Sequence, residues 1–372
     1  MIQKLLPEVC HIQYGFPFDS KRFSNKEGTP LIRIRDVVRG YTETFTTEQC
    51  SDDYIVKKGD ILIGMDGMFN VAKWNGNTAY LNQRVCKLEP KSSIVANYLF
   101  YYLPCALKKI ENKTAFVTVK HLKAKQLNSI LIPYPSIKEQ EKIAQTLDLL
   151  FRLIYKKKKQ LNSLDELVKS RFLEMISVDK GWPLVKLDTL CDSIVRGPFG
   201  SALKVSFFVE KGPDTVKVYE QKNAIQRSAK LGESYVTQDK YQELKRFSCG
   251  PGDFIMSCSG TIGCLYQIPE GAESGIINQA LCKFHLNGKM LPEVFLTYMR
   301  NSVDQIETKG SGIKNIGAVS YIKNMEIALP PIEVQQQFAE FINQSDKSKM
   351  AVQRSLDELE TLKKSLMQTY FG

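Results

Sequence analysis

Histidine is scarce in this chain, and long apolar runs are missing from it. The 372 residues include three histidines, and His11, His121 and His285 stand too far apart to suggest a histidine-based metal site. No stretch approaches the roughly 18 apolar residues of a membrane-spanning helix. The opening MIQKLLP has no apolar segment as long as that of a signal peptide. We therefore expect a cytoplasmic protein with no membrane partner.

Motifs for metals, nucleotides and cofactors are also missing. The nine cysteines are an odd number and include no C-x-x-C pair, so reduced and mostly buried thiols are expected. The sequence has no G-x-x-x-x-G-K-S/T, no G-x-G-x-x-G and no N-P-P-Y of an amino-methyltransferase. Only Asp214, Glu220 and Lys222 imitate a nuclease metal site, and their spacing is short for one. We expect neither a metal, a cofactor nor catalysis in this chain.

Positive charge is in excess. Lysine and arginine total 51 against 40 aspartates and glutamates, which gives a net charge of +11 and a pI of about 9.0. Such an excess favours a polyanionic partner, with nucleic acid foremost and an acidic protein surface as the alternative.

The chain also repeats itself, with a period of roughly 190 residues that exceeds the length of a solenoid repeat. Matching segments occur in the same order in both halves. They are GFPFDS and GPFGS, GDILI and GDFIM, NQRVCKL and NQALCKF, YLFYYL and VFLTYM, PSIKEQ and PPIEVQ, and LDEL and LDEL. The protein is therefore a tandem duplication of a domain-sized unit.

Each repeat is predicted to begin with short strands and one helix and to end in a long helix. The expected strands are 31–37, 60–64 and 82–88, then 216–219, 253–257 and 278–284, and the expected helices are 95–110 and 291–306. Apolar residues at 3/4 spacing predict long helices over 140–176 and 334–370, each about 55 Å long. Their equal length favours antiparallel packing about a pseudo-twofold axis.

The predicted fold class is α+β, with two similar mixed α/β domains separated by two long antiparallel coiled-coil helices. The expected segments are a first recognition domain at 1–136, a helical spacer at 137–179, a second domain at 180–331 and a second spacer at 332–372. The apolar stripe of each predicted long helix is interrupted by polar residues in its middle. This interruption fits either a solvated stretch or positions that set the register of the helix pair.

Several motifs that recur in the same order in both repeats resemble those of the specificity (S) subunit of type I restriction-modification systems. They are the L-x(3)-C starts (Leu6 to Cys10, Leu187 to Cys191), the glycine-rich segments above, the SGTIG loop at 259–263, the P-x(4)-Q-x-x-I/F-A helix entries and the closing LDEL helices. The resemblance covers the whole chain. The first repeat departs from it by reading MDGMFN at 65–70 in place of the SGTIG loop.

The resemblance implies two target recognition domains that read a bipartite, asymmetric DNA sequence, while the helices set the spacer between half-sites. It also implies two methyltransferase (M) subunits and restriction (R) subunits as partners, with S-adenosylmethionine, ATP and Mg on those subunits. A non-DNA assembly scaffold of the same architecture is the alternative, and a metal-dependent nuclease is a weaker one.

Residues suited to phosphates or base edges cluster on the expected loops, where a merely solvated polar surface would look similar. Arg33 and Arg35 alternate on the expected strand and would share one face. The DNA-binding candidates of the first repeat are Tyr14, Lys21, Arg22, Arg33, Arg35, Arg39 and Lys73. Those of the second are Arg196, Lys204, Tyr219, Gln221, Lys222, Asn223, Arg227, Lys309, Lys314 and Asn315. The partner-binding candidates are Lys156, Lys157, Lys158 and Lys159.

Overall fold

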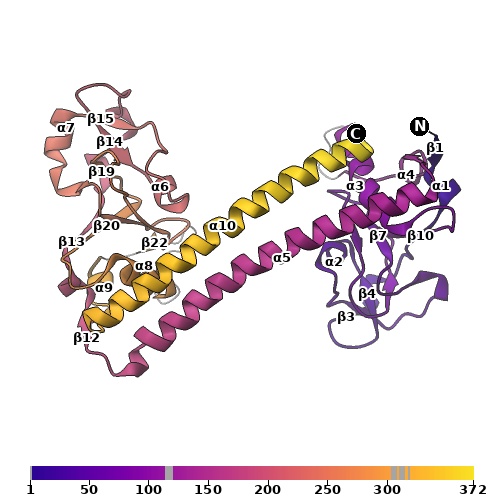
Figure 1. The fold of residues 1–372 in the computed structure, drawn as a ribbon, viewed down its shortest axis with the longest axis horizontal. Coiled ribbons are helices and arrows are strands. Elements are labelled where there is room, and N and C mark those ends of the chain that lie inside the picture. Colours follow the sequence, from indigo (N-terminus) through magenta and orange to yellow (C-terminus); the bar gives the residue numbers. More distant parts are fainter. Residues whose placement is uncertain (1, 114–119, 303–307, 310–314, 317–318) are drawn as a thin grey trace. The chain divides into compact units, whose positions relative to one another are not determined.

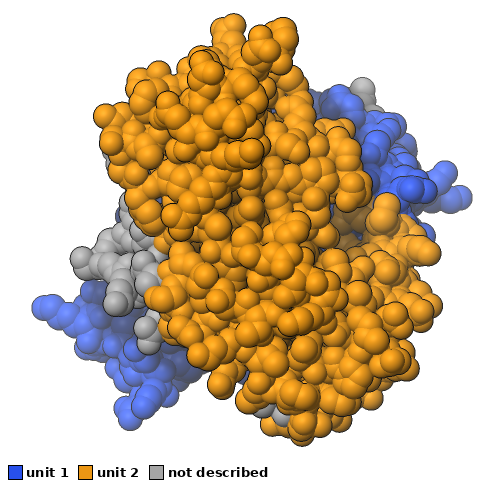
Figure 2. Space-filling model, turned by 90° about the vertical axis from the view of Figure 1, so that its left-hand side faces the viewer, with its two compact units in different colours: residues 1–159, 354–372 blue, residues 160–353 orange. Residues whose placement is uncertain are grey.

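The chain folds into two compact units, which are coloured separately in Figure 2. A computed structural model describes residues 2–113, 120–302, 308–309, 315–316 and 319–372. Unit 1 comprises residues 1–159 and 354–372, and unit 2 comprises residues 160–353. This grouping differs from the four predicted segments because two long helices each contribute to both units.

Those helices are α5 (Ile137–Ile176) and α10 (Ile332–Phe371), each of 40 residues (Figure 1). They confirm the two long helices predicted from the apolar spacing. Across the part of the chain that is described, no helix is both long and apolar enough to cross a bilayer.

Unit 1 contains two main sheets with helices beside them. The first sheet has the order β2-β10-β7-β8, and the second has the order β3-β5-β4-β9-β6. The strands are β1 (Gln3–Leu5), β2 (Cys10–Tyr14), β3 (Phe23–Ser24), β4 (Thr29–Ile32), β5 (Phe45–Thr46), β6 (Ile55–Val56), β7 (Ile61–Gly64), β8 (Val71–Lys73), β9 (Ala79–Leu81), β10 (Val85–Pro90) and β11 (Leu131–Pro133). The helices are α1 (Leu6–Val9), α2 (Ile34–Arg39), α3 (Ala96–Lys113) and α4 (Ala124–Asn128), with 3-10 turns η1 (Ser20–Arg22) and η2 (Asp52–Tyr54).

Unit 2 repeats most of this plan, although its second sheet has four strands where that of unit 1 has five. Its sheets have the orders β13-β20-β17-β18 and β15-β14-β19-β16, and β12 pairs with β23 as β1 pairs with β11. The strands are β12 (Leu184–Lys186), β13 (Cys191–Arg196), β14 (Thr215–Tyr219), β15 (Tyr235–Thr237), β16 (Ser248–Cys249), β17 (Phe254–Ser257), β18 (Leu265–Gln267), β19 (Gly275–Ile277), β20 (Leu281–Leu286), β21 (Thr308–Lys309), β22 (Asn315–Ile316) and β23 (Glu326–Ala328). The helices are α6 (Gln221–Ile225), α7 (Gln238–Glu243), α8 (Pro292–Ser302) and α9 (Val319–Lys323), with 3-10 turns η3 (Val178–Lys180), η4 (Leu187–Leu190), η5 (Gly200–Ala202), η6 (Val205–Phe207) and η7 (Lys245–Phe247). The predicted fold class is confirmed.

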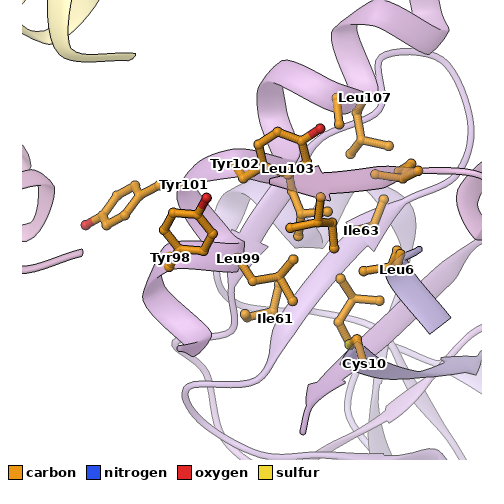
Figure 3. Packing of buried hydrophobic residues seen from close by; sticks show 14 of the residues in the cluster. Leu6, Cys10, Ile61, Ile63, Tyr98, Leu99, Tyr101, Tyr102, Leu103 and Leu107 are labelled. Atoms are coloured by element: carbon orange, nitrogen blue, oxygen red, sulfur yellow. The ribbon is translucent and has the colours of Figure 1, made fainter. Parts of the chain in front are cut away.

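The L-x(3)-C motif belongs to the core of each unit. In unit 1, Leu6 and Cys10 pack against Ile61 and Ile63 of β7, beneath α3 (Figure 3). Leu187 and Cys191 occupy the matching core of unit 2. Burial raises the pKa of both cysteines to about 12, so they act as apolar core residues. All nine thiols are free, and six of them are buried, as predicted.

Within each unit, α5 and α10 pack antiparallel. In unit 1, Lys158 pairs with Glu360 at 3.0 Å, and Lys363 lies over the ring of Phe151 at 5.0 Å. Residue numbers therefore increase along α5 in the direction in which they decrease along α10. Unit 2 shows the same direction in its own contacts, since Asp165 pairs with Lys349 and Phe172 packs on Phe338.

The core of unit 1 also includes the end of the chain. Phe371 is 4% exposed and packs edge-on against Tyr98 and Tyr102 of α3, with ring centroids 5.5 and 5.6 Å apart. The last turn of α10 is therefore a core element of unit 1, most of which precedes residue 160.

One predicted strand is wrong. The stretch 31–37 was expected to be extended, but β4 ends at Ile32 and α2 begins at Ile34. The Asp36 carboxylate accepts a hydrogen bond from the Arg33 backbone N–H at 2.9 Å and so fixes a helix start. Arg33 and Arg35 therefore do not alternate along a strand.

The other predicted elements differ from the structure mainly at their ends. The strands β10 and β20 begin three residues later than predicted, because Asn82 and Asn278 form tight turns before them. The helix α3 continues to Lys113, beyond the predicted end at residue 110. The helix α8 ends at Ser302, and the rest of the predicted 291–306 lies outside the described residues.

Candidate nucleic-acid interface

A glycine–asparagine contact anchors the same loop in each unit. A Cβ at Gly15 would lie 2.0 Å from the backbone oxygen of Asn82, and one at Gly197 would lie 1.9 Å from that of Asn278. The Gly15 N–H donates to Val85 and the Gly197 N–H to Leu281. The GFPF and GPFGS motifs therefore begin with glycine because two backbone segments touch there.

A short helix starts beside this contact in each unit. The Arg33 N–H donates to Asp36, and the Glu220 N–H donates to the Asn223 side chain at 2.8 Å. These two bonds make Arg33 equivalent to Glu220 as the residue before α2 and α6. Counting from there, Arg35 is equivalent to Lys222, so both helices carry a cation in their first turn.

In unit 2, the SGTIG loop lies against this helix start. The Gln221 side-chain amide donates to the carbonyl of Ser259 and, at 3.4 Å, to that of Thr261. The Cys258 N–H donates to Ala280 at 2.7 Å, which joins the loop to the turn at Asn278. The glutamine thus holds the loop that follows β17.

Unit 1 builds the corresponding loop differently. Asp66 pairs with Arg84 at 3.3 Å and with the Nδ1 atom of His121 at 2.6 Å. A Cβ at Gly64 would lie 3.1 Å from Ile34 of α2, so this loop also meets the helix start. We define a helix–loop face in each unit. In unit 1 it comprises the first turn of α2 with residues 65–70 and 82–84. In unit 2 it comprises the first turn of α6 with residues 258–264 and 278–280.

The structure leaves most candidate cations of unit 1 exposed. Lys21, Arg22, Arg33, Arg35 and Arg39 are exposed, and all but the first two border or belong to α2. Arg35 lies 3.5 Å from Asp36, and Arg39 lies 4.0 Å from Glu43. The exposed Arg39–Glu43 pair binds weakly, so Arg39 can turn to a phosphate, whereas Arg35, although exposed itself, pairs with the buried Asp36 and donates to Thr44 at 3.2 Å.

Two candidates of unit 1 have contacts of their own within the protein. Lys73 is half-buried between the Asn97 side chain and the ring of Phe100. The Tyr14 hydroxyl faces Asn128 at 3.4 Å. Because their side chains already have partners within unit 1, both are weaker candidates for DNA contact.

Three candidates of unit 2 are buried. Tyr219 is fully buried, and its hydroxyl donates to the backbone of Glu273 at 2.7 Å. Asn223 is fully buried, and its amide donates to Ser228 and Leu231. Arg196 is 7% exposed and lies over the ring of Phe199. We remove all three from the proposed DNA surface, because their side chains are enclosed by the unit itself.

Four of the remaining candidates of unit 2 are at least partly accessible. Lys204, Lys222 and Arg227 are exposed, and Gln221 is half-buried beside the SGTIG loop. Lys309 and Asn315 lie in the hairpin of β21 and β22, which pairs Lys309 with Asn315. Lys314 lies outside the described residues.

The lysine run on α5 is largely exposed. Lys156, Lys158 and Lys159 are exposed and Lys157 is half-buried. Lys158 is engaged by Glu360 within unit 1. The other three leave their charge on the helix surface, where a partner could meet it.

The nuclease-like fragment does not form one site. Asp214 precedes β14 and Glu220 follows it, so the strand separates their backbones by roughly 20 Å. Glu220 instead pairs with Lys222 at 2.8 Å. Within the described ranges, no cluster of three or more histidine, cysteine, aspartate or glutamate side chains could hold a metal.

Sequence reasoning missed Arg84 and the role of Gln221 as a loop anchor. Arg84 is exposed within the conserved-looking NQRVCKL segment, and its counterpart in the second repeat is Ala280. The two repeats differ at this position of an otherwise matching segment, and comparing them position by position could have found this residue.

The comparisons with known proteins cover both units. Residues 3–166 and 210–361 match the family model of the type I restriction modification DNA specificity domain. The EcoBI specificity subunit of Escherichia coli is 27% identical, over 98% of this chain and 84% of that protein. The MjaVIII specificity subunit of Methanocaldococcus jannaschii is 25% identical, over 91% and 87%.

Solved structures share the fold. The S subunit of a type I restriction-modification system from M. genitalium has a TM-score of 0.58 at 13% identity, and the match covers 100% of this chain and 96% of that one. A chain from a structural study of complex assembly in the type I R-M system has a TM-score of 0.61 at 15% identity, covering 100% and 97%.

Proposed function

Because this chain belongs to the family of type I restriction-modification DNA specificity domains, we propose that it selects the DNA target of such a system. Each unit reads one half-site of a bipartite, asymmetric sequence. The helices α5 and α10 set the number of base pairs between the half-sites. The chain supplies recognition and leaves the chemistry to its partners.

The observation that carries this proposal is the duplicated helix–loop face. Both units keep the glycine–asparagine contact, the capped helix start and the cation in its first turn. They differ in the side chains beside them, since Ile34 and Arg84 of unit 1 occupy the positions of Gln221 and Ala280 in unit 2. A shared frame with different side chains suits two modules that read different base sequences.

The proposed partners are methyltransferase and restriction subunits, as the names of the relatives suggest. In unit 1, Leu149 and Leu153 are 56% and 38% exposed and lie one turn apart on α5. We propose that a methyltransferase subunit covers this apolar strip and contacts the neighbouring lysine run. S-adenosylmethionine, ATP and Mg would be bound by those partner subunits.

A methylation map tests the proposal directly. Sequencing that detects methylated adenine, in the host with and without this gene, should show a two-part motif that disappears with the gene. A scaffold that does not read DNA would leave methylation at the same sites. A nuclease would cleave DNA as an isolated chain with Mg²⁺.

Single-residue variants then test the helix–loop face. Arg35→Ala should weaken binding of the assembled methyltransferase through the first half-site, and Lys222→Ala through the second. If each cation contacts a phosphate, its loss should reduce the salt slope of log K by about 0.9. Lys108→Ala is the matched control, because Lys108 is an exposed cation on α3 that pairs with Glu111. Equal effects from all three variants would contradict the assignment of the face.

A further inference from the structure

A positively charged pocket of about 500 Å³ lies in unit 2, at the end of α6 away from the SGTIG loop. It is bordered by segments around β14, β15 and β18 and by the residues after α6. Its charged lining comprises the cations Lys211, Lys217, Arg227 and Lys230 and the carboxylates Glu270 and Glu273. The helix–loop face does not include this pocket, and the proposed function assigns it no role.

Lys217 is the first sign that the pocket takes an anion. The side chain is 5% exposed, and among the described residues its ammonium makes one long hydrogen bond, of 3.5 Å, to the carbonyl of Gly232. The nearest aromatic rings, those of Tyr219 and Tyr235, are 5.8 and 5.9 Å away. A buried ammonium is costly unless it is paired, and it has three protons to donate.

The two carboxylates that could neutralise Lys217 are engaged elsewhere, and one of them, Glu220, pairs with Lys222 at 2.8 Å. Glu273 forms an ion pair with Lys211 and accepts a hydrogen bond from the Tyr235 hydroxyl at 3.3 Å. Burial accordingly lowers the pKa of Lys217, and the opposing pull of Glu273 is the smaller influence. The pocket therefore holds a cation with donors to spare and a surplus of positive charge.

Arg227 is the second, independent sign. It is the one non-glycine residue with positive φ, at 50°, among those described. The equivalent residue of unit 1, also the seventh after the residue that starts the helix, is Gly40 with φ of 76°. The backbone needs a left-handed residue there, and unit 1 uses the amino acid that adopts this conformation freely. Unit 2 keeps an arginine despite the strain, as is typical of functional sites.

Unit 1 has a pocket at the same place without the charge. Pro30 pairs with Phe45 across β4 and β5, as Lys217 pairs with Tyr235 across β14 and β15. Pro30 therefore occupies the position of Lys217. The unit 1 pocket measures about 230 Å³ and is lined only by neutral residues, among them Trp74. The positive pocket is thus a property of unit 2 and is not required by the fold.

We infer that the unit 2 pocket binds the phosphate of a nucleoside phosphate, held by Lys217 and Arg227, within the DNA that unit 2 reads. Its volume lies in the range of roughly 300–1,000 Å³ that holds small ligands. The five residues of α6, Gln221–Ile225, rise about 7.5 Å along the helix axis, and Arg227 lies two residues beyond its end, so the pocket and the SGTIG loop lie at opposite ends of a helix shorter than the roughly 12 Å width of the major groove. A backbone phosphate across the groove from the SGTIG loop can therefore reach the pocket. The inference rests on the proposed function for its DNA source.

The first experiment uses the full chain assembled with its methyltransferase subunits and a duplex that contains the methylated motif. Methylphosphonate groups replace single phosphates around the second half-site. We expect one position at which neutralisation weakens wild-type binding by about tenfold. Arg227→Gly should weaken binding by a similar factor, lower the salt slope by about 0.9, and remove the sensitivity at that position alone. Lys289→Ala, at an exposed turn of the same unit, should change none of these.

A second arm separates the possible phosphate sources. Inorganic phosphate and adenosine monophosphate are titrated without DNA, with thermal stabilisation as the readout. Stabilisation that Arg227→Gly and Lys217→Gln both abolish, with DNA affinity unchanged, supports the pocket and makes a free nucleotide its ligand. The inference is overturned if neither arm responds to the variants.

The same variants also show whether a loss of binding is caused by a loss of folding. Arg227→Gly places in unit 2 the residue that unit 1 uses, so it should melt no lower than wild type even if Lys217→Gln does not fold. If no variant of the chain binds DNA, the proposed function fails while the nucleotide arm still tests the pocket. If Arg35→Ala weakens DNA binding but the pocket variants have no effect in either experiment, the proposed function stands and the pocket inference fails.

Discussion

The glycine–asparagine contact yields a quantitative prediction. In Gly197→Ala, the new Cβ would lie 1.9 Å from the carbonyl oxygen of Asn278, 2.5 Å from its carbonyl carbon and 3.0 Å from the Gln279 nitrogen. All three neighbours are backbone atoms, so no side chain can rotate away. The Asn278 turn must therefore separate from the end of β13.

The size of the effect follows from that geometry. Overpacking by one methyl group costs about 1–3 kcal/mol, and contact with rigid backbone favours the upper end. For a unit of this size, each kcal/mol lowers Tm by about 2–4 °C. We therefore expect Gly197→Ala to lower the Tm of unit 2 by roughly 6–12 °C.

Calorimetry of the full chain, with hydrogen exchange to identify the unit that loosens, measures this change. Gly15→Ala should have the same effect on unit 1, because its Cβ would lie 2.0 Å from the Asn82 oxygen. Gly212→Ala is the matched control in unit 2, since its Cβ would meet only the Thr215 methyl group at an ordinary 3.8 Å. The reasoning is refuted if Gly197→Ala and Gly212→Ala have the same Tm.

The remaining predictions concern a buried amide, a buried cation and the helices. Gln335→Ala should lower the free energy of unfolding, measured by urea denaturation, by about 1–3 kcal/mol, because the Gln335 amide bonds the backbones of Leu291, Lys289 and Pro330. The control Gln336→Ala, at an exposed neighbour, should leave it almost unchanged. Because burial lowers the pKa of Lys217 below its ordinary 10.5, the folded chain binds its proton less tightly than the unfolded chain, so wild type should gain stability relative to Lys217→Met as the pH rises toward 10.5. A constant difference would contradict this. Removal of residues 157–163 and 351–357 shortens each helix by about 10 Å, so methylome sequencing should show a spacer about three base pairs shorter with both half-sites unchanged, and altered half-sites would disprove the role of the helices.

The repeat carried most of the information that the sequence held about the fold. Matching motifs predicted two units of one design, and the four-stranded sheets β2-β10-β7-β8 and β13-β20-β17-β18 do have equivalent strand orders. The motifs themselves proved to be structural, since each L-x(3)-C pair lies in a core and each helix-entry glutamine, Gln140 or Gln335, bonds a neighbouring turn.

The site was harder to predict because contacts between distant residues decide it. The alternation of Ile32, Arg33, Ile34 and Arg35 is typical of a strand, yet the single bond from Arg33 to Asp36 starts a helix. That signal was available, because a residue suited to capping stands three positions later in both repeats. Tyr219 is buried in a core cluster, and its hydroxyl bonds Glu273, 54 positions away, so no local pattern of the sequence predicts its burial.

The place of Phe371 has a consequence for synthesis. A ribosome that has completed the first 159 residues has made every strand of unit 1 but not the helix that closes its core. Unit 1 must therefore wait, partly open, while unit 2 is translated, and it can close only when the final turn of α10 leaves the exit tunnel. A chain cut short by a premature stop near its end would lose the first recognition module and not merely the last helix.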